Sequence, residues 1–426
     1  MDASLTRLLH PLRDRAVALL WGGMALSAIG DQAYAVALSW ILVDAFGASA
    51  SAIVALGPAS TLLAALLIGR LADRWPPLRA MAGADVARAA VLLGVVGAWA
   101  LAGAPPLAGL VLAVVTLGVG QAVFRPALQS VLPGLVPDRG TLPAANALLD
   151  ATERLARLLG PALAGLLAAV LPLRHLLTFD ALTFLASAGA LWGIGRVRAV
   201  PAMPAAGPPG GIVASLTRGW RVVRRHPLLG YVLATTGVLN AAWYAVFFVL
   251  LPLMVARGAG GPGSTGLAAY GLVISAYGCT NLLANLLVGS RPMPERPGRQ
   301  IFAGNCCLGA GILLLAAVDA AAPGWALLPG YMLAAGVAAV GGPMQDIPVA
   351  VLRQTALPAS DVPAAMRAFM AVTQGVTLLA LLALPAIAAA LPVGAMVALC
   401  GGAILLVGAV GLRRFGAPSP PGRGLG

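Results

Sequence analysis

The chain has 426 residues, of which 60% are hydrophobic and only 10% are charged. Soluble domains average about 45–50% apolar and about 25% charged residues, so this chain has too little polar surface for a water-facing globule of its size. A soluble enzyme, a disordered chain and a nucleic-acid-binding protein are therefore excluded as main interpretations. The net charge of +13, with arginine as the basic residue throughout, is better explained by membrane topology.

Continuous apolar runs predict membrane-spanning helices, each of which needs about 20 mostly apolar residues. The runs do not alternate with polar residues, which excludes a transmembrane β-barrel. We predict an all-α membrane protein with twelve transmembrane helices, expected at 16–44, 51–70, 80–102, 107–130, 142–170, 173–195, 228–256, 265–289, 300–319, 323–347, 362–390 and 392–412.

The segment 196–227 divides these spans into two sets of six. Its first part is rich in Pro and Gly, and its second part carries Arg218, Arg221, Arg224 and Arg225. We interpret it as a topology signal and a tether, with an amphipathic helix on anionic headgroups as the alternative. The predicted domains are an N-terminal six-helix bundle (1–195), a cytoplasmic linker (196–227), a C-terminal six-helix bundle (228–412) and a cytoplasmic tail (413–426).

An internal repeat supports this division. Leu142-Pro143-Ala144-Ala145 recurs as Val362-Pro363-Ala364-Ala365, an offset of 362 − 142 = 220 residues. Leu171-Pro172-Leu173 and Leu391-Pro392-Val393 match at the same offset. A constant offset across several helices indicates two parallel six-helix repeats.

The distribution of arginine predicts the orientation. With a cytoplasmic N-terminus, only Arg174 and Arg257 lie on the outer side, which satisfies the positive-inside rule. We therefore expect a multi-pass protein of the cell inner (plasma) membrane with both termini in the cytoplasm.

The loop between the second and third spans carries the most specific motif. It reads Gly69-Arg70-Leu71-Ala72-Asp73-Arg74, with Arg79 a few positions on. This resembles motif A of the major facilitator superfamily, G-x-L-A-D-R. The resemblance implies a cytoplasmic latch that includes Gly69, Asp73, Arg74 and Arg79. Asp85 and Arg88, one turn apart at the inner end of the third span, could extend the latch or pair with each other.

A second motif lies in the fifth span, where Gly160, Pro161 and Gly165 occur within six residues. It resembles motif C of the superfamily's antiporters, with alanine at two of the glycine positions. The resemblance implies a proton-coupled exporter. The alternative is an ordinary packing face of small residues.

The first half of the chain further resembles the branch that contains the enterobactin exporter and macrolide efflux proteins. The stretches that carry this resemblance are Gly30-Asp31, the motif A loop, Phe124-Arg125-Pro126-Ala127, Leu142-Pro143-Ala144-Ala145-Asn146 and Phe179-Asp180-Ala181-Leu182.

Charges inside the spans are candidates for function, because each costs roughly 2.5–3.5 kcal/mol or more at the middle of a bilayer. Asp31 lies about 15 residues into the first span and has no arginine within a helical turn along the chain. We expect it to bind protons or a substrate cation; the alternative is a carboxyl held by Gln32 or a neighbouring helix. Gln121 and Arg125 are candidates for substrate contact or for neutralising the fifth span.

Three further features have weaker interpretations. Asp180, in the sixth span, is expected to be structural, and Asp346, near the inner end of the tenth, could take part in gating. Trp243 and Tyr244 begin an aromatic group in the seventh span. It would form a wall for a flat substrate if it faces a cavity, and is merely bulky if it faces lipid.

The sequence predicts a secondary active transporter, and no enzyme. We expect proton-coupled efflux of a small amphiphilic molecule, such as a drug, a siderophore or a secondary metabolite, by alternating access. The alternatives are a facilitator-type importer or uniporter, and a receptor or assembly partner that does not transport. Expected partners are the small-molecule substrate, protons and membrane lipids, with no nucleic acid, no cofactor and no metal.

Overall fold

The computed structural model describes residues 10–67, 75–136, 142–197, 211–261, 263–291, 293–358 and 361–416. Over these residues the chain is built of helices, and none of them forms a strand. Ten helical stretches among them are long and apolar enough to cross a membrane. The first, from Arg15 to Ala64, includes the first expected span and most of the second.

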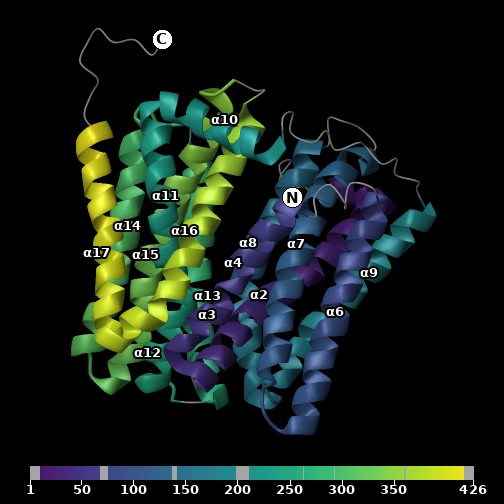
Figure 1. Ribbon diagram of the computed structural model, residues 1–426, viewed down its shortest axis with the longest axis horizontal. Coiled ribbons are helices and arrows are strands. Elements are labelled where there is room, and N and C mark those ends of the chain that lie inside the picture. The colour runs from purple at the N-terminus through teal and green to yellow at the C-terminus, as the bar shows by residue number, and fades with distance from the viewer. Residues whose placement is uncertain are drawn as a thin grey trace. The chain divides into compact units, whose positions relative to one another are not determined.

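The six predicted spans of the first half each coincide with helical structure (Figure 1). The helices are α2 (Arg15–Phe46), α3 (Ala50–Val54) with α4 (Leu56–Leu67), α6 (Pro77–Ala102), α7 (Leu107–Leu135), α8 (Leu142–Val170) and α9 (Arg174–Val197). The first half of α8 carries the charged residues Glu153, Arg154 and Arg157. The expected all-α fold is thereby confirmed for this half.

The second half contains the other six spans. They are α11 (Pro227–Ala245) with the π-helix η4 (Val246–Leu250) and α12 (Leu251–Arg257), then α13 (Gly263–Gly289), α14 (Pro297–Ala321), α15 (Gly324–Thr355), α16 (Val362–Ala390) and α17 (Val393–Phe415). The predicted limits of the eleventh span, 362–390, are those of α16.

Two predicted limits are wrong by more than a turn. The fourth span was expected to end at residue 130, whereas α7 continues to Leu135. The tenth span was expected to end at residue 347, between two prolines, whereas α15 continues to Thr355 through Pro343 and Pro348. A proline inside a membrane helix is tolerated because neighbouring helices and local adjustments satisfy the backbone groups that it frees. Asp346 consequently lies within α15 and not near its end.

The described helices fall into two compact units. Unit 1 comprises residues 1–207 together with 260–275, and unit 2 comprises 208–259 together with 276–426. The first part of α13 thus packs with unit 1, whereas the remainder of this helix packs with unit 2. The domain limits expected from the sequence stay a prediction.

Small residues bring the helices of unit 2 close together. A Cβ atom on Gly309 of α14 would lie 2.6 Å from the backbone nitrogen of Leu405 and 2.8 Å from the carbonyl oxygen of Gly401, both on α17. Without a hydrophobic driving force between helices in lipid, such close backbone approach is what supplies the packing energy.

The segment between the two sets of spans contains a helix, α10 (Gly211–Arg225). The amphipathic helix was the alternative to a plain tether in the sequence analysis, and the structure shows this helix over the second part of the segment. Its arginine-rich end leads within two residues into α11, at Pro227.

His226 forms the junction, as the N-cap of α11. Its Nδ1 atom accepts a hydrogen bond of 3.3 Å from the backbone N–H of Leu229. Burial lowers the pKa of His226 from its usual value of 6.5. Only the unprotonated Nδ1 atom can accept this bond.

We expect the stability of the purified protein to depend on pH through this cap. Because the pKa of His226 is lowered by folding, its contribution is complete above pH 6.5 and is lost as the pH falls through the lower pKa of the folded state. An N-cap is worth about 1 kcal/mol. A His226→Asn variant, whose cap does not titrate, should lose this component of the pH dependence of thermal unfolding. An unchanged pH profile in the variant would contradict this assignment.

Candidate functional site

A group of polar side chains lies inside unit 1, where α2, α6, α7 and α9 meet. We call it the polar cluster, and its members are Asp31 of α2, Asp85 and Arg88 of α6, Gln121 of α7, and Asp180, Thr183 and Ser187 of α9. Asp85 and Asp180 are fully buried, and Arg88 is 3% exposed. Charged groups at such positions are costly and call for partners.

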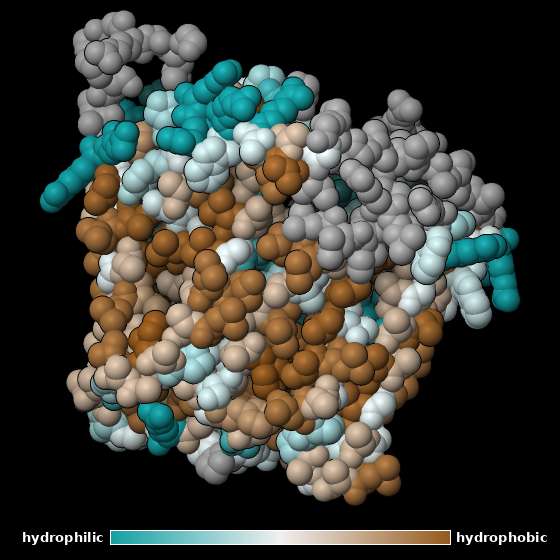
Figure 2. All heavy atoms as spheres, in the orientation of Figure 1, coloured by the Kyte–Doolittle hydropathy of each residue, from teal (hydrophilic) through white to brown (hydrophobic). Residues whose placement is uncertain are grey.

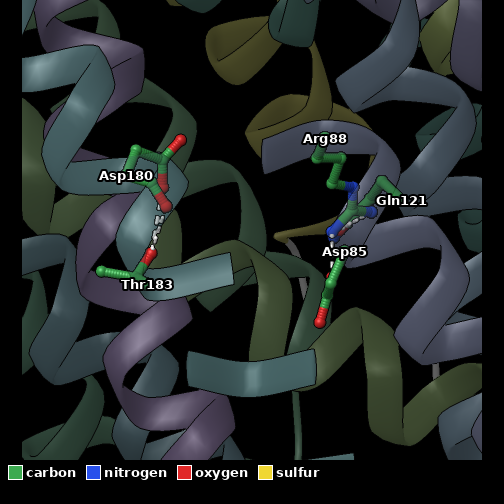
Figure 3. A network of polar contacts seen from close by, with 5 residues as sticks. All are labelled: Asp85, Arg88, Gln121, Asp180 and Thr183. Atoms are coloured by element: carbon green, nitrogen blue, oxygen red, sulfur yellow. Dashed lines mark hydrogen bonds and ion pairs between the residues drawn. The ribbon is translucent and has the colours of Figure 1, made fainter. Parts of the chain in front are cut away.

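Arg88 is the hub of the cluster (Figure 3). Its Nη1 atom lies 3.2 Å from Oδ1 of Asp85, and its Nη2 atom donates to Oε1 of Gln121 at 3.4 Å. The guanidinium also lies over the rings of Phe124 and Phe184, at 5.7 and 5.1 Å from their centroids. The charge of Arg88 is therefore held by an anion, an amide and two aromatic faces.

Gly120 of α7 makes room for this guanidinium. A Cβ atom at Gly120 would collide with Nε of Arg88 and would lie 2.9 Å from its Cζ atom. The side chain of Arg88 can therefore reach Gln121 only because the preceding residue of α7 is a glycine.

Asp180 occupies the other side of the cluster in Figure 3. The Thr183 hydroxyl donates to its Oδ1 atom at 3.3 Å, and the same hydroxyl lies 2.7 Å from the Asp180 carbonyl oxygen. The Oδ2 atom of Asp180 is buried and has no hydrogen-bond partner among the described residues. Gly30 of α2 packs directly on this carboxyl, because a Cβ atom there would lie 2.5 Å from Oδ1.

Asp31 follows Gly30 and is only partly buried. It interacts electrostatically with Arg88 and with Arg125, and it is repelled by Glu153. No arginine lies within a helical turn of Asp31 along α2, but α6 and α7 bring Arg88 and Arg125 toward it. Among the described residues, however, Asp31 makes no direct ion pair of 4 Å or less.

Arg125 of α7 forms an ion pair with a residue of the fifth span. Its Nη2 atom lies 3.0 Å from Oε1 of Glu153 on α8, and both side chains are partly exposed. Of the two roles considered for Arg125, neutralisation of the fifth span matches this contact. This contact joins two different helices, α7 and α8.

The charges of the buried part of the cluster do not balance. Three carboxyls, those of Asp31, Asp85 and Asp180, lie around the guanidinium of Arg88, and the second arginine near Asp31, Arg125, is itself paired with Glu153. Of these three carboxyls, only that of Asp85 forms an ion pair with Arg88 among the described residues. Uncompensated charge is expensive in a low-dielectric interior, so this cluster is the candidate functional site of unit 1.

The glycines of the fifth-span motif contact two other helices within unit 1. A Cβ atom on Gly160 of α8 would lie 3.0 Å from the backbone nitrogen of Ala33 and would collide with Cβ of Gln32, both on α2. Gly165 similarly faces Ala268 of α13, at 3.2 Å from its Cα atom. Gly160 thus presses against the turn of α2 that carries Asp31.

The aromatic group of the seventh span forms a cluster of its own within unit 2. Trp243 donates through Nε1 to the hydroxyl of Tyr277 on α13 at 3.0 Å. The rings of Tyr244 and Phe248 stack with centroids 4.6 Å apart, and Phe247 meets Tyr277 at 4.7 Å. Phe247 and Phe248 belong to the π-helix η4, a form of helix that often occurs at functional sites.

The other predicted site residues stand as follows. Gly69, Asp73 and Arg74 of the motif A loop lie outside the described residues, while Arg79 is exposed at the start of α6. Asp85 and Arg88 pair with each other, which is one of the two roles expected for them. The latch stays a prediction.

Sequence reasoning assigned Asp180 a structural role and overlooked Thr183 and Ser187. Ser187 is buried and lies close to the carboxyl of Asp85. The signal was present, because residues 180, 183 and 187 are spaced i, i+3 and i+7 and share one face of a helix. What the sequence did not reveal is which helices this face contacts.

The family model of the Major Facilitator Superfamily matches residues 20–376. The chain belongs to the Major Facilitator Superfamily. No curated protein sequence matches it. Members of this superfamily and the structures described next are transporters, not enzymes, and the chain is accordingly a transporter of this type.

Solved structures confirm the fold. A peptide transporter of the POT family in complex with alafosfalin is similar with a TM-score of 0.74 and 12% identity, over 97% of this chain and 98% of that one. A bacterial homologue of the iron transporter ferroportin, in its inward-facing state, is similar with a TM-score of 0.70 and 17% identity, over 94% of this chain and 98% of that one. A POT family transporter in complex with 5-aminolevulinic acid is similar with a TM-score of 0.70 and 13% identity, over 95% of this chain and 96% of that one.

Proposed function

We propose that this protein exports a small amphiphilic molecule, such as a drug, a siderophore or a secondary metabolite, in exchange for protons. The observation that carries the proposal is the charge imbalance of the polar cluster, in which three carboxyls lie around Arg88. A site that binds and releases a proton inside the transmembrane helices is what coupling to a proton gradient requires.

Asp31 is the member of the cluster suited to exchange the proton. Asp85 is fully buried and paired with Arg88, and Asp180 is fully buried against Gly30 and Thr183. Asp31 alone among the three is partly exposed. A proton that binds a carboxylate oxygen of Asp31 removes one negative charge from the cluster, and its release on the other side of the membrane restores that charge.

The direction of transport rests on the fifth-span motif. Gly160 packs against α2 at Gln32 and Ala33, next to Asp31. A change in the position of α8 would therefore be transmitted to the turn that holds the proton. This contact and the resemblance to motif C favour an antiporter over the alternative of an importer or uniporter, and they support a place in the enterobactin exporter and macrolide efflux branch.

The location follows from the distribution of arginine. We place the protein in the cell inner (plasma) membrane with both termini in the cytoplasm, since the outer side then carries only Arg174 and Arg257. The motif A loop would latch the two halves on the cytoplasmic side. A POT family structure with TM-score 0.70 holds 5-aminolevulinic acid, which supports a small organic substrate for this chain.

Accumulation of a fluorescent cationic dye in efflux-deficient cells tests this function. Cells that produce the protein should accumulate less dye than cells with an empty vector, and a protonophore should abolish the difference. Unchanged accumulation at confirmed membrane expression would contradict export of broad specificity. A difference that survives the protonophore would contradict proton coupling and favour the uniporter.

A further inference from the structure

A cavity of about 720 Å³ lies between α10 and α16, entirely within unit 2. Binding sites for small molecules are clefts of about 300–1,000 Å³, so this cavity has the size of one. It is lined on α10 by Leu216, Thr217, Trp220, Arg221, Arg224 and Arg225, and on α16 by Ala368, Ala371 and Val372.

The two walls of the cavity are fixed to each other. Nε of Arg218 lies 2.7 Å from Oδ1 of Asp361, which precedes α16, and Nε of Arg367 donates to the Ser215 hydroxyl at 2.6 Å. Gly219 packs on the backbone of α16, since a Cβ atom there would collide with the carbonyl group of Ala364. α10 is therefore docked on α16 and is not a loose tether.

The rim of the cavity is strongly basic. Arg221, Arg224 and Arg225 are exposed, and none of them forms an ion pair with a carboxylate among the described residues. The nearby acid Asp361 already binds Arg218. Trp220 is 40% exposed and lies under the Arg224 guanidinium, at 5.9 Å from its ring centroid. Figure 2 shows hydrophilic atoms gathered over this part of unit 2.

The rest of the lining is apolar and extends along a membrane span. α16 belongs to a stretch, Val362–Ala390, that can cross the membrane, and Ala368, Ala371 and Val372 lie two to three turns into it. The span that follows α10 begins at Pro227, two residues after Arg225. The basic rim therefore lies at the membrane border, and the apolar wall lies on its hydrocarbon side.

We propose that this cavity binds one anionic phospholipid of the adjacent leaflet. The phosphate would meet Arg221, Arg224 and Arg225, and Trp220 would lie at the level of the headgroup, where tryptophan is enriched. The first acyl carbons would pack on Ala371 and Val372. A soluble anion would use the arginines alone and would leave the apolar wall without an occupant. A lipid uses both, which is why we commit to it.

Native mass spectrometry of the full chain in detergent tests the proposal with phosphatidylglycerol and phosphatidylcholine as probes. A single phosphatidylglycerol should bind more tightly than phosphatidylcholine. A variant with R221Q, R224Q and R225Q should weaken this first binding step by about a hundredfold, taking about fivefold for each arginine near the membrane surface. Excess inorganic phosphate should not displace the lipid; displacement would overturn the lipid as occupant.

Two further variants distinguish lipid binding in the cavity from nonspecific attraction to surface charge. A control with R291Q, R413Q and R414Q removes three exposed arginines of unit 2 that do not line the cavity. It should leave the first binding step unchanged, and an equal loss in both triple variants would overturn the proposal. A371F fills the cavity without a change in charge and should also weaken binding. Undiminished binding in A371F would show that the lipid is not in the cavity.

Discussion

Replacing Asp31 with asparagine is expected to abolish proton-driven substrate movement while leaving the protein folded in the membrane. Asparagine has nearly the same size and keeps a hydrogen-bonding side chain, but it carries no proton that can be exchanged near neutral pH. In liposomes with an imposed pH gradient, dye movement should fall to the level of protein-free liposomes. Exchange of dye down its own gradient is expected to persist, because the packing of α2 on α8 is unchanged.

The matched control for this variant is Asp44→Asn. Asp44 lies on the same helix, α2, but is exposed near its end and belongs to no contact of the polar cluster. This variant should retain proton-driven movement. If Asp31→Asn also retains it at the normal rate, Asp31 is not the coupling carboxyl, and Asp180 becomes the next residue to test, since its Oδ2 atom is buried without a described partner.

The sequence predicted the helices well because each helix depends on the residues of its own segment. A run of about 20 apolar residues is enough to predict a span, and the limits of α8 and α16 were predicted to the residue. The end of α15 was missed because a proline ends most helices in water, whereas in this membrane protein α15 continues through Pro343 and Pro348. Local sequence does not show which neighbours satisfy the freed carbonyl groups.

The candidate site could be predicted only in part. Asp31, Asp85, Arg88 and Gln121 stand out as polar residues in apolar runs, and the spacing also predicted that Asp85 and Arg88 could pair. Other partners come from different helices: Gln121 is 33 residues from Arg88, and Glu153 is 28 residues from Arg125. Pairing along one helix follows from spacing, but pairing between helices depends on which faces meet, and periodicity does not specify that.

Removing Arg88 is expected to destabilise the protein more than any change on its surface. Arg88→Met would leave Asp85 fully buried without its only ion-pair partner among the described residues. Loss of one partner of a buried ion pair costs about 3–5 kcal/mol, because the remaining charge stays desolvated. The thermal unfolding temperature of the purified variant should fall well below that of the wild type, as measured in detergent.

The double variant Asp85→Asn with Arg88→Gln shows whether this loss arises from the pair or from the guanidinium alone. It removes both charges and keeps polar groups of similar size, so most of the lost stability should return. A latch role predicts a different result. A residue that only stabilises one conformational state of the transporter can be removed with little effect on the unfolding temperature. A stable Arg88→Met variant with altered transport would therefore favour the latch. A destabilised variant rescued by the second change assigns Asp85 and Arg88 to the structural core of the polar cluster, with Asp31 left as its proton-exchanging member.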